Sequence, residues 1–120
     1  MFESELLFKA RIVQLILLKQ VDEALKLLSR NYGVDTPKLK VGMPKRHHGK
    51  VGCYVQKTRT IHVVDGEKLG DPFVILHEFY HHLRNIGGKH KGTEKNANRF
   101  AKEFLEAFIT LKEATKAADV

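Results

Sequence analysis

The spacing of apolar residues changes twice along this chain of 120 residues. The spacing is helical over residues 4–31, alternating over residues 38–64, and helical again over residues 72–86 and 93–114. A helix buries one stripe of side chains and a strand buries one face, so each change of period requires a change of secondary structure. The order helix, sheet, helix, helix predicts one α+β domain, residues 1–120, with a small three-stranded sheet that is antiparallel or mixed.

The first helical segment contains a short run, residues 12–18, that is almost entirely apolar. We therefore expect this helix to be packed on most of its sides and to end at Gly33, and its pattern allows a break over residues 19–22. The run is too short to cross a bilayer, and the N-terminus, with Glu3 and Glu5, does not resemble a signal peptide. We expect a cytoplasmic protein that does not insert into membranes.

The formal net charge of +7 comes entirely from residues 36–64, which contain no Asp or Glu. The basic residues of this segment are Lys38, Lys40, Lys45, Arg46, Lys50, Lys57 and Arg59. The segment is open to three interpretations: a solvated face, the rim of a cleft for an acidic peptide or protein substrate, or a surface for nucleic acid. Its only Phe, Tyr or Trp is Tyr54, so base stacking has little support. The candidates for a substrate rim are Lys50, Tyr54, Lys57 and Arg59.

Local signals place the two C-terminal helices. Asp71 followed by Pro72 is a strong helix start, Gly87-Gly88 a helix end, and Thr93 can cap the last helix. The expected buried stripes are Phe73, Leu76, Tyr80 and Leu83 in the first of these helices, and Ala97, Phe100, Ala101, Phe104, Phe108 and Leu111 in the second.

The first of these helices carries an HExxH motif, His77-Glu78-Phe79-Tyr80-His81. Residues four apart lie on one face of a helix, one turn apart, so both imidazoles can converge on one metal ion. Glu78 projects about 100° round the helix, where it can reach a water on the metal rather than the metal itself. Zn²⁺ lowers the pKa of such a water to about 7, and a neighbouring carboxylate can accept its proton.

The next helix offers a third ligand. Glu94 lies at its start, 13 residues after His81, and the small residues Ala97 and Ala101 follow on the same face and allow close helix packing. Two His and one Glu with an open fourth position form a catalytic zinc site rather than a closed structural one. The sequence therefore predicts a Zn²⁺ site.

The HEFYH motif, followed by an ExxANxFA pattern over residues 94–101, resembles the gluzincin metallopeptidases and, among them, the ImmA/IrrE family. The short length and the order of elements also resemble the archaeal minigluzincins. The resemblance covers about residues 51–108. It implies that His77, His81 and Glu94 are zinc ligands and that Glu78 is the general base. The sequence departs from the pattern at Asn98, where many gluzincins carry an Asp.

The remaining histidines have less specific interpretations. His82 points to another side of the helix than His81, so we expect a surface residue or one that supports the metal ligands. His90, in the loop between the helices, and His62, on a predicted strand, are the candidates for stabilising the transition state. His47 and His48 are expected to be loop residues of the basic segment.

Three functional hypotheses follow. The first is a zinc metallopeptidase in which Glu78 deprotonates a water and then protonates the leaving amine. The second is a zinc-stabilised binding module with weak catalysis, whose basic face binds nucleic acid or an acidic protein partner. The third is a latent peptidase, in which the tail, residues 110–120, covers the cleft until it is removed.

Overall fold

The computed structural model describes the backbone of residues 3–47, 49–86, 89–90 and 92–118, and the side chains of these residues except 3, 86, 89–90 and 117–118. The elements in chain order are α1 (Glu3–Leu17), α2 (Val21–Tyr32), β1 (Lys38–Val41), β2 (Gly52–Val55), β3 (Thr60–Val63), the 3₁₀ turn η1 (Lys68–Gly70), α3 (Pro72–Leu83), β4 (Asn85–Ile86), β5 (Lys89–His90) and α4 (Glu94–Ala118). The predicted α+β class and the order of elements are confirmed.

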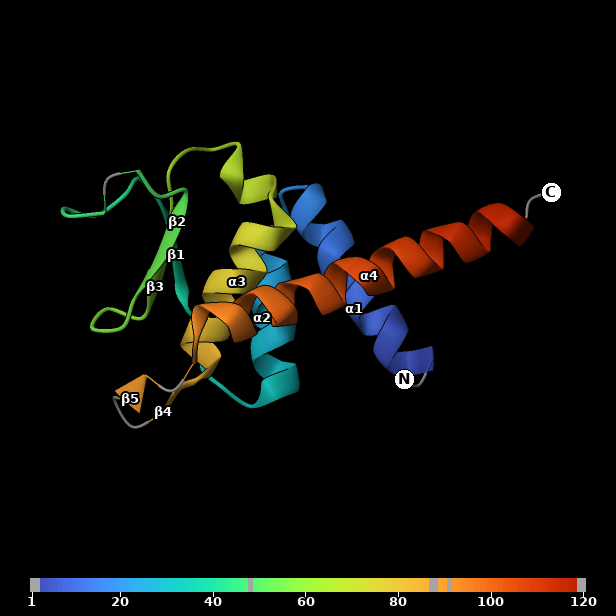
Figure 1. Cartoon of the computed structure of the whole chain (residues 1–120), viewed down its shortest axis with the longest axis horizontal. Coiled ribbons are helices and arrows are strands. Elements are labelled where there is room, and N and C mark those ends of the chain that lie inside the picture. Colours follow the sequence, from blue (N-terminus) through green and yellow to red (C-terminus); the bar gives the residue numbers. More distant parts are fainter. Residues whose placement is uncertain (1–2, 48, 87–88, 91, 119–120) are drawn as a thin grey trace.

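The three-stranded sheet has the order β1-β3-β2 and is mixed. The β2–β3 hairpin is antiparallel, with Tyr54 opposite Ile61, whereas β1 runs parallel to β3, with Leu39 opposite Ile61. Figure 1 shows this sheet at one end of the molecule, next to α3, with α1 on the other side of α3 and α4 running from near α3 away from the sheet. The edge strand β2 therefore lies beside the helix that carries the HExxH motif.

The first helical segment is divided in two. Helix α1 ends at Leu17 and α2 begins at Val21, so the break that the pattern allowed is present, with Lys19 in the left-handed region at φ 60°. Gly33 ends α2 with φ 68°, as expected. The expectation that the apolar run is packed on most sides is only partly right. Ile12, Val13 and Ile16 are fully buried, but Leu17 and Leu18, at the break, are 48% and 62% exposed.

The core face of α3 differs from the predicted stripe. Ile75, Leu76 and Phe79 are fully buried, whereas Tyr80 is only half-buried and packs against the ring of Phe100, with ring centroids 5.6 Å apart. The helix is apolar on most of its sides, so periodicity alone could not choose between Phe79 and Tyr80.

Two boundaries also differ from prediction. Helix α3 ends at Leu83 rather than at residue 86, because the chain turns into the short strand β4, which pairs antiparallel with β5. Helix α4 continues to Ala118, beyond the predicted end at residue 114, because the tail is rich in Ala and Lys, which favour a helix. The expected stop at Gly87-Gly88 lies outside the described residues.

The tail lies far from the sheet. Figure 1 shows the last turns of α4 projecting from the end of the molecule opposite to the sheet. Side chains of residues 108–116 line an apolar groove against α1 instead. In the part of the chain that the structure describes, no helix is long and apolar enough to span a membrane.

The start of α3 depends on one side chain. Asp71 Oδ1 accepts hydrogen bonds from the backbone N–H groups of Phe73 and Val74, at 3.0 and 3.3 Å, and Pro72 occupies the first helical position. We predict that Asp71→Ala lowers the free energy of unfolding by about 1 kcal/mol, measured by urea denaturation. Asp71→Asn, which keeps the acceptor, should remain within a few tenths of a kcal/mol of wild type; equal losses in both variants would contradict the capping role.

Candidate metal centre

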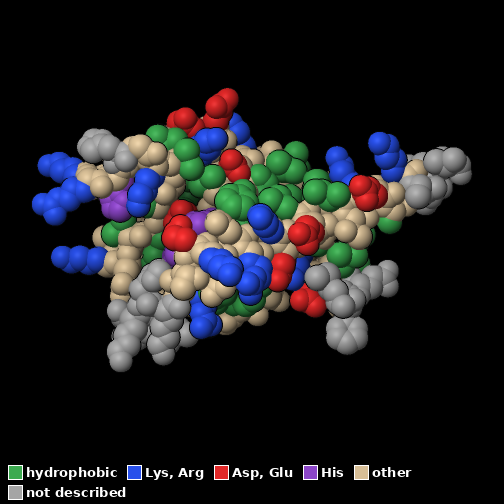
Figure 2. Space-filling model, in the orientation of Figure 1, with side chains coloured by type: hydrophobic (Ala, Val, Ile, Leu, Met, Phe, Trp, Pro, Cys, Tyr) green, Lys and Arg blue, Asp and Glu red, His purple; other side chains and the backbone are tan. Residues whose placement is uncertain are grey.

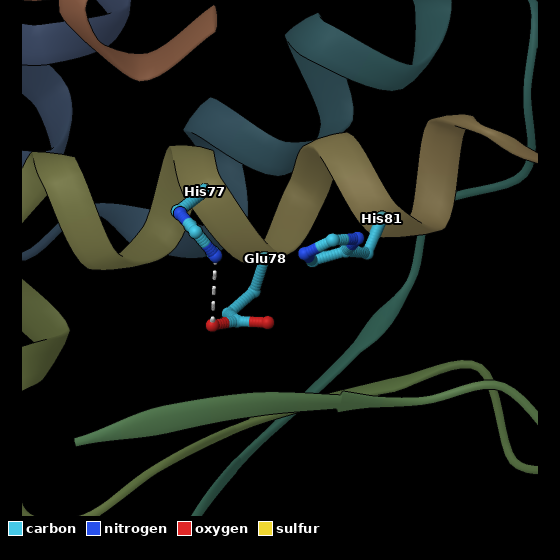
Figure 3. Close-up of side chains that lie close together, drawn as sticks. All are labelled: His77, Glu78 and His81. Atoms are coloured by element: carbon cyan, nitrogen blue, oxygen red, sulfur yellow. Dashed lines mark ion pairs between the residues drawn. The ribbon is translucent and has the colours of Figure 1, made fainter. Parts of the chain in front are cut away.

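Three side chains of α3 form a compact group that can hold a metal ion. The potential ligand atoms of His77, Glu78 and His81 all lie within 4.8 Å of one another. Figure 3 shows the three side chains on the side of α3 that faces the sheet. The two imidazoles come from successive turns of the helix and are 5.1 Å apart between ring centroids. The predicted convergence of the HExxH residues is therefore present.

Glu94, at the first residue of α4, reaches the same group. Its Oε2 lies 2.9 Å from Nε2 of His77, and its Oε1 lies 2.7 Å from Nε2 of His81. The start of α4 is fixed by Thr93, whose hydroxyl accepts a hydrogen bond from Asn96 N–H at 3.1 Å, as predicted. The close packing expected of the small residues is also present, because Ala97 and Ala101 are completely buried.

Asn98 fixes the tautomer of His77. The Nδ1–H of His77 donates to Oδ1 of Asn98 at 2.9 Å, because the amide oxygen can only accept. With Nδ1 engaged in this way, Nε2 is the nitrogen of His77 that faces Glu94, and it is the nitrogen that would bind a metal ion once its proton is released. Asn98 is the residue at which the sequence departs from the gluzincin pattern. Its contact with Nδ1 is of the kind that orients a histidine whose other ring nitrogen binds a metal ion.

The two carboxyl groups of the site differ in environment. Glu78 is buried, and this desolvation raises its pKa to about 7; the charge of Glu94 also raises it, while those of His77 and Lys50 oppose the change. Glu94 has a largely exposed side chain. Desolvation is the largest single influence and raises its pKa, but the charges and hydrogen bonds of His77 and His81 together outweigh it and hold the pKa below its ordinary value.

A cavity of about 530 Å³ opens beside this group. Glu78, His81 and Glu94 line it on the helical side, and β2 with the loop before it forms the other wall. This wall includes two residues whose position the sequence did not indicate, namely His47 and the buried Cys53. The prediction that His47 is only a loop residue was incomplete, because nothing local in the sequence shows that the loop folds towards α3.

Gly52 allows β2 to approach α3 closely. A Cβ atom at this position would lie 2.7 Å from Cγ1 of Val74 and 3.6 Å from Cγ of Glu78. A larger residue would therefore force the Val74 side chain or the adjoining backbone to shift, next to the general-base candidate. Sequence reasoning missed Gly52, although a glycine inside an alternating strand is a recognised sign of close backbone approach.

Tyr54 and His82 connect this wall to the helices. The Nε2–H of His82 donates to the carbonyl oxygen of Asp35 at 2.6 Å, so Nδ1 carries a lone pair that accepts the Tyr54 hydroxyl at 2.8 Å. Burial lowers the pKa of His82, which favours this neutral form. His82 is therefore a buried residue that joins Tyr54 to the segment before β1, and not a surface residue. Tyr54 lines the cavity, but its hydroxyl proton is already committed.

The other predicted site residues are placed elsewhere. His62 contacts the carbonyl oxygen of Gly42 through Nδ1 at 3.0 Å and does not line the cavity. Arg59 pairs with Asp35 at 3.0 Å, and Lys57 is an exposed turn residue outside the cavity lining. Lys50 does line the cavity. The side chain of His90 lies outside the described residues, as does His48.

Comparisons with family models, with curated proteins and with solved structures found no match for this chain. The geometry of the site is therefore the basis for its functional interpretation.

The orientation of His77 by Asn98 leads to a prediction. Asn98→Ala should lower the affinity for Zn²⁺, measured by competition with a chromophoric chelator, by about 10- to 100-fold, because His77 loses the partner that fixes its tautomer. Asn98→Asp, which keeps an acceptor, should bind at least as tightly as wild type. Asn96→Ala, an exposed position on the same turn of α4, is the matched control and should leave the affinity unchanged. An unchanged affinity in Asn98→Ala would contradict His77 as a ligand oriented in this way.

Proposed function

We propose that this protein is a zinc-dependent metallopeptidase, with His77, His81 and Glu94 as metal ligands and Glu78 as general base. The observation that carries the proposal is the position of Glu94. A carboxylate from a separate helix lies 2.9 and 2.7 Å from the two Nε2 atoms, at the point to which both imidazoles are directed. Oε2 of Glu78, by contrast, lies 4.0 Å from Nε2 of His77, farther away than the Glu94 carboxylate.

The donor set fits zinc. Two neutral imidazole nitrogens and one carboxylate are the protein ligands of many catalytic zinc sites, and the Asn98 contact prepares His77 for this role. A zinc ion bound there supplies a Lewis acid and a water of lowered pKa. The resemblance of HEFYH and residues 94–101 to the gluzincin metallopeptidases supports the same assignment.

The protein residues would then handle the protons. Glu78 accepts a proton from the attacking water on a carboxylate oxygen and returns it to the amine that leaves the cleaved peptide. Its burial beside the cavity keeps this carboxylate close to the reacting atoms and out of bulk solvent. The position of β2 supports an extended peptide as substrate. In the described part of the chain this strand pairs only with β3, so its other edge can hydrogen-bond a substrate backbone.

A second candidate is a zinc-stabilised module that binds nucleic acid or an acidic protein and has little hydrolytic activity. The charge of residues 36–64 favours it. A latent form closed by the tail receives no support from the geometry, because residues 108–116 lie against α1.

The two candidates differ in the expected effect of Glu78→Gln. Wild type and variant should both contain about one zinc per chain, and the wild type should cleave a mixed peptide library. The variant should lose about 10²- to 10⁴-fold of this activity, because a Gln cannot accept the proton. Metal content and cleavage are measured on the same samples.

Zinc in both proteins with cleavage in neither would favour the binding module. Protein purified without chelators that contains no stoichiometric metal would exclude both candidates.

A further inference from the structure

The positive charge of the molecule is concentrated at the sheet end, close to the candidate metal centre. Figure 2 shows Lys and Arg side chains projecting from this end, beside the histidines. All seven basic residues of 36–64 belong to the sheet and its connecting loops, and none of their neighbours in this segment is acidic.

Lys50 is the basic side chain that the geometry places there. It lines the cavity next to β2, and the other Lys and Arg residues of the segment do not. Arg59, in the turn between β2 and β3, is already paired with Asp35 at 3.0 Å. Within the described residues, no carboxylate lies within 4.0 Å of the ammonium group of Lys50. The positive charge of Lys50 acts on groups in the cavity. It opposes the rise in pKa that burial causes at Cys53.

The charge balance of the cavity leaves Lys50 available. The carboxylates that line the cavity are those of Glu78 and Glu94. A divalent cation at the metal centre would neutralise both of them. Lys50 then has no counter-ion in the described cavity wall, and His47, on the same wall, adds a second hydrogen-bonding group. An anionic group entering the cavity would supply the missing partner.

We propose that the cavity selects peptides with an acidic side chain near the scissile bond, and that Lys50 binds the carboxylate of that side chain. This inference rests on the proposed peptidase function and adds its substrate class. A nucleic acid fits the cavity less well. Tyr54, the tyrosine of the wall, is held by a hydrogen bond to His82, with the two rings edge-on and their centroids 5.3 Å apart, so the wall does not present a row of aromatic rings on which successive bases could stack.

Binding can be measured separately from cleavage. Fluorescent peptides that differ only by Glu or Gln at one position, scanned along the peptide, are titrated into the zinc-loaded Glu78→Gln variant. For at least one position we expect the Glu peptide to bind about fivefold more tightly, and this preference should weaken at high salt. Adding Lys50→Gln should abolish the preference, and Lys50→Glu should reverse it in favour of a Lys-containing peptide. Lys26→Gln, an exposed residue of α2, is the control and should leave it intact.

The outcomes separate this inference from the proposed function. Equal affinities for Glu and Gln peptides at every position, or a preference that survives Lys50→Gln, would overturn the role of Lys50. A single-stranded oligonucleotide of equal charge that competes more strongly than the Glu peptide would overturn it in favour of nucleic acid. A Lys50-dependent preference without cleavage by protein that retains Glu78 would support the subsite and contradict the peptidase.

Discussion

The close packing of α4 against α3 is the contact on which the candidate metal centre depends. An HExxH helix by itself brings two imidazoles and one carboxylate together, but Glu94 joins them only if its helix begins within reach. Small residues make this possible. Ala97 and Ala101 are fully buried between the helices, and a Cβ atom at Gly92 would lie 2.6 Å from Cε2 of Tyr80. Thr93 then starts α4 directly after this close approach.

A second close approach occurs where the sheet meets α3. Gly52 lets the edge strand β2 rest on Val74 and beside Glu78, so β2 and the start of α4 both come close to α3 at the cavity. The Tyr54–His82–Asp35 chain of hydrogen bonds fixes this second wall, since it joins β2, α3 and the segment before β1. The candidate metal ligands and the wall of the cavity beside them are thus both held in place by contacts with α3.

What the sequence could predict follows from the range of the interactions. The caps at Asp71 and Thr93 and the HExxH spacing act within one helical turn, so local patterns were sufficient to find them. Glu94 could be predicted as the third ligand because the start of its helix is also marked by a local signal, the cap at Thr93. The sequence could not indicate that β1 runs parallel to β3, because that pairing depends on how a long connection crosses the sheet.

The failures have the same physical origin. His47 and Cys53 line the cavity because a loop and an edge strand fold onto α3, and no periodicity records such a contact. The choice of Phe79 over Tyr80 for the core was equally hidden, since α3 is apolar on most sides and the position of α4 decides which ring is covered. The supporting role of His82 required a carbonyl 47 residues away in the chain.

Asn98, where many gluzincins carry an Asp, affects the charge of the site. An amide oxygen orients His77 as a carboxylate would, but it adds no negative charge. Burial raises the pKa of Glu78 to about 7 and the charge of Glu94 adds to this rise, so a third carboxylate nearby would raise the pKa of Glu78 further. With Asn at this position the charges of Glu78 and Glu94 match those of one divalent cation. Lys50 then has no counter-ion in the described cavity wall, so the neutral partner of His77 and the proposed preference for acidic peptides would follow from one charge balance.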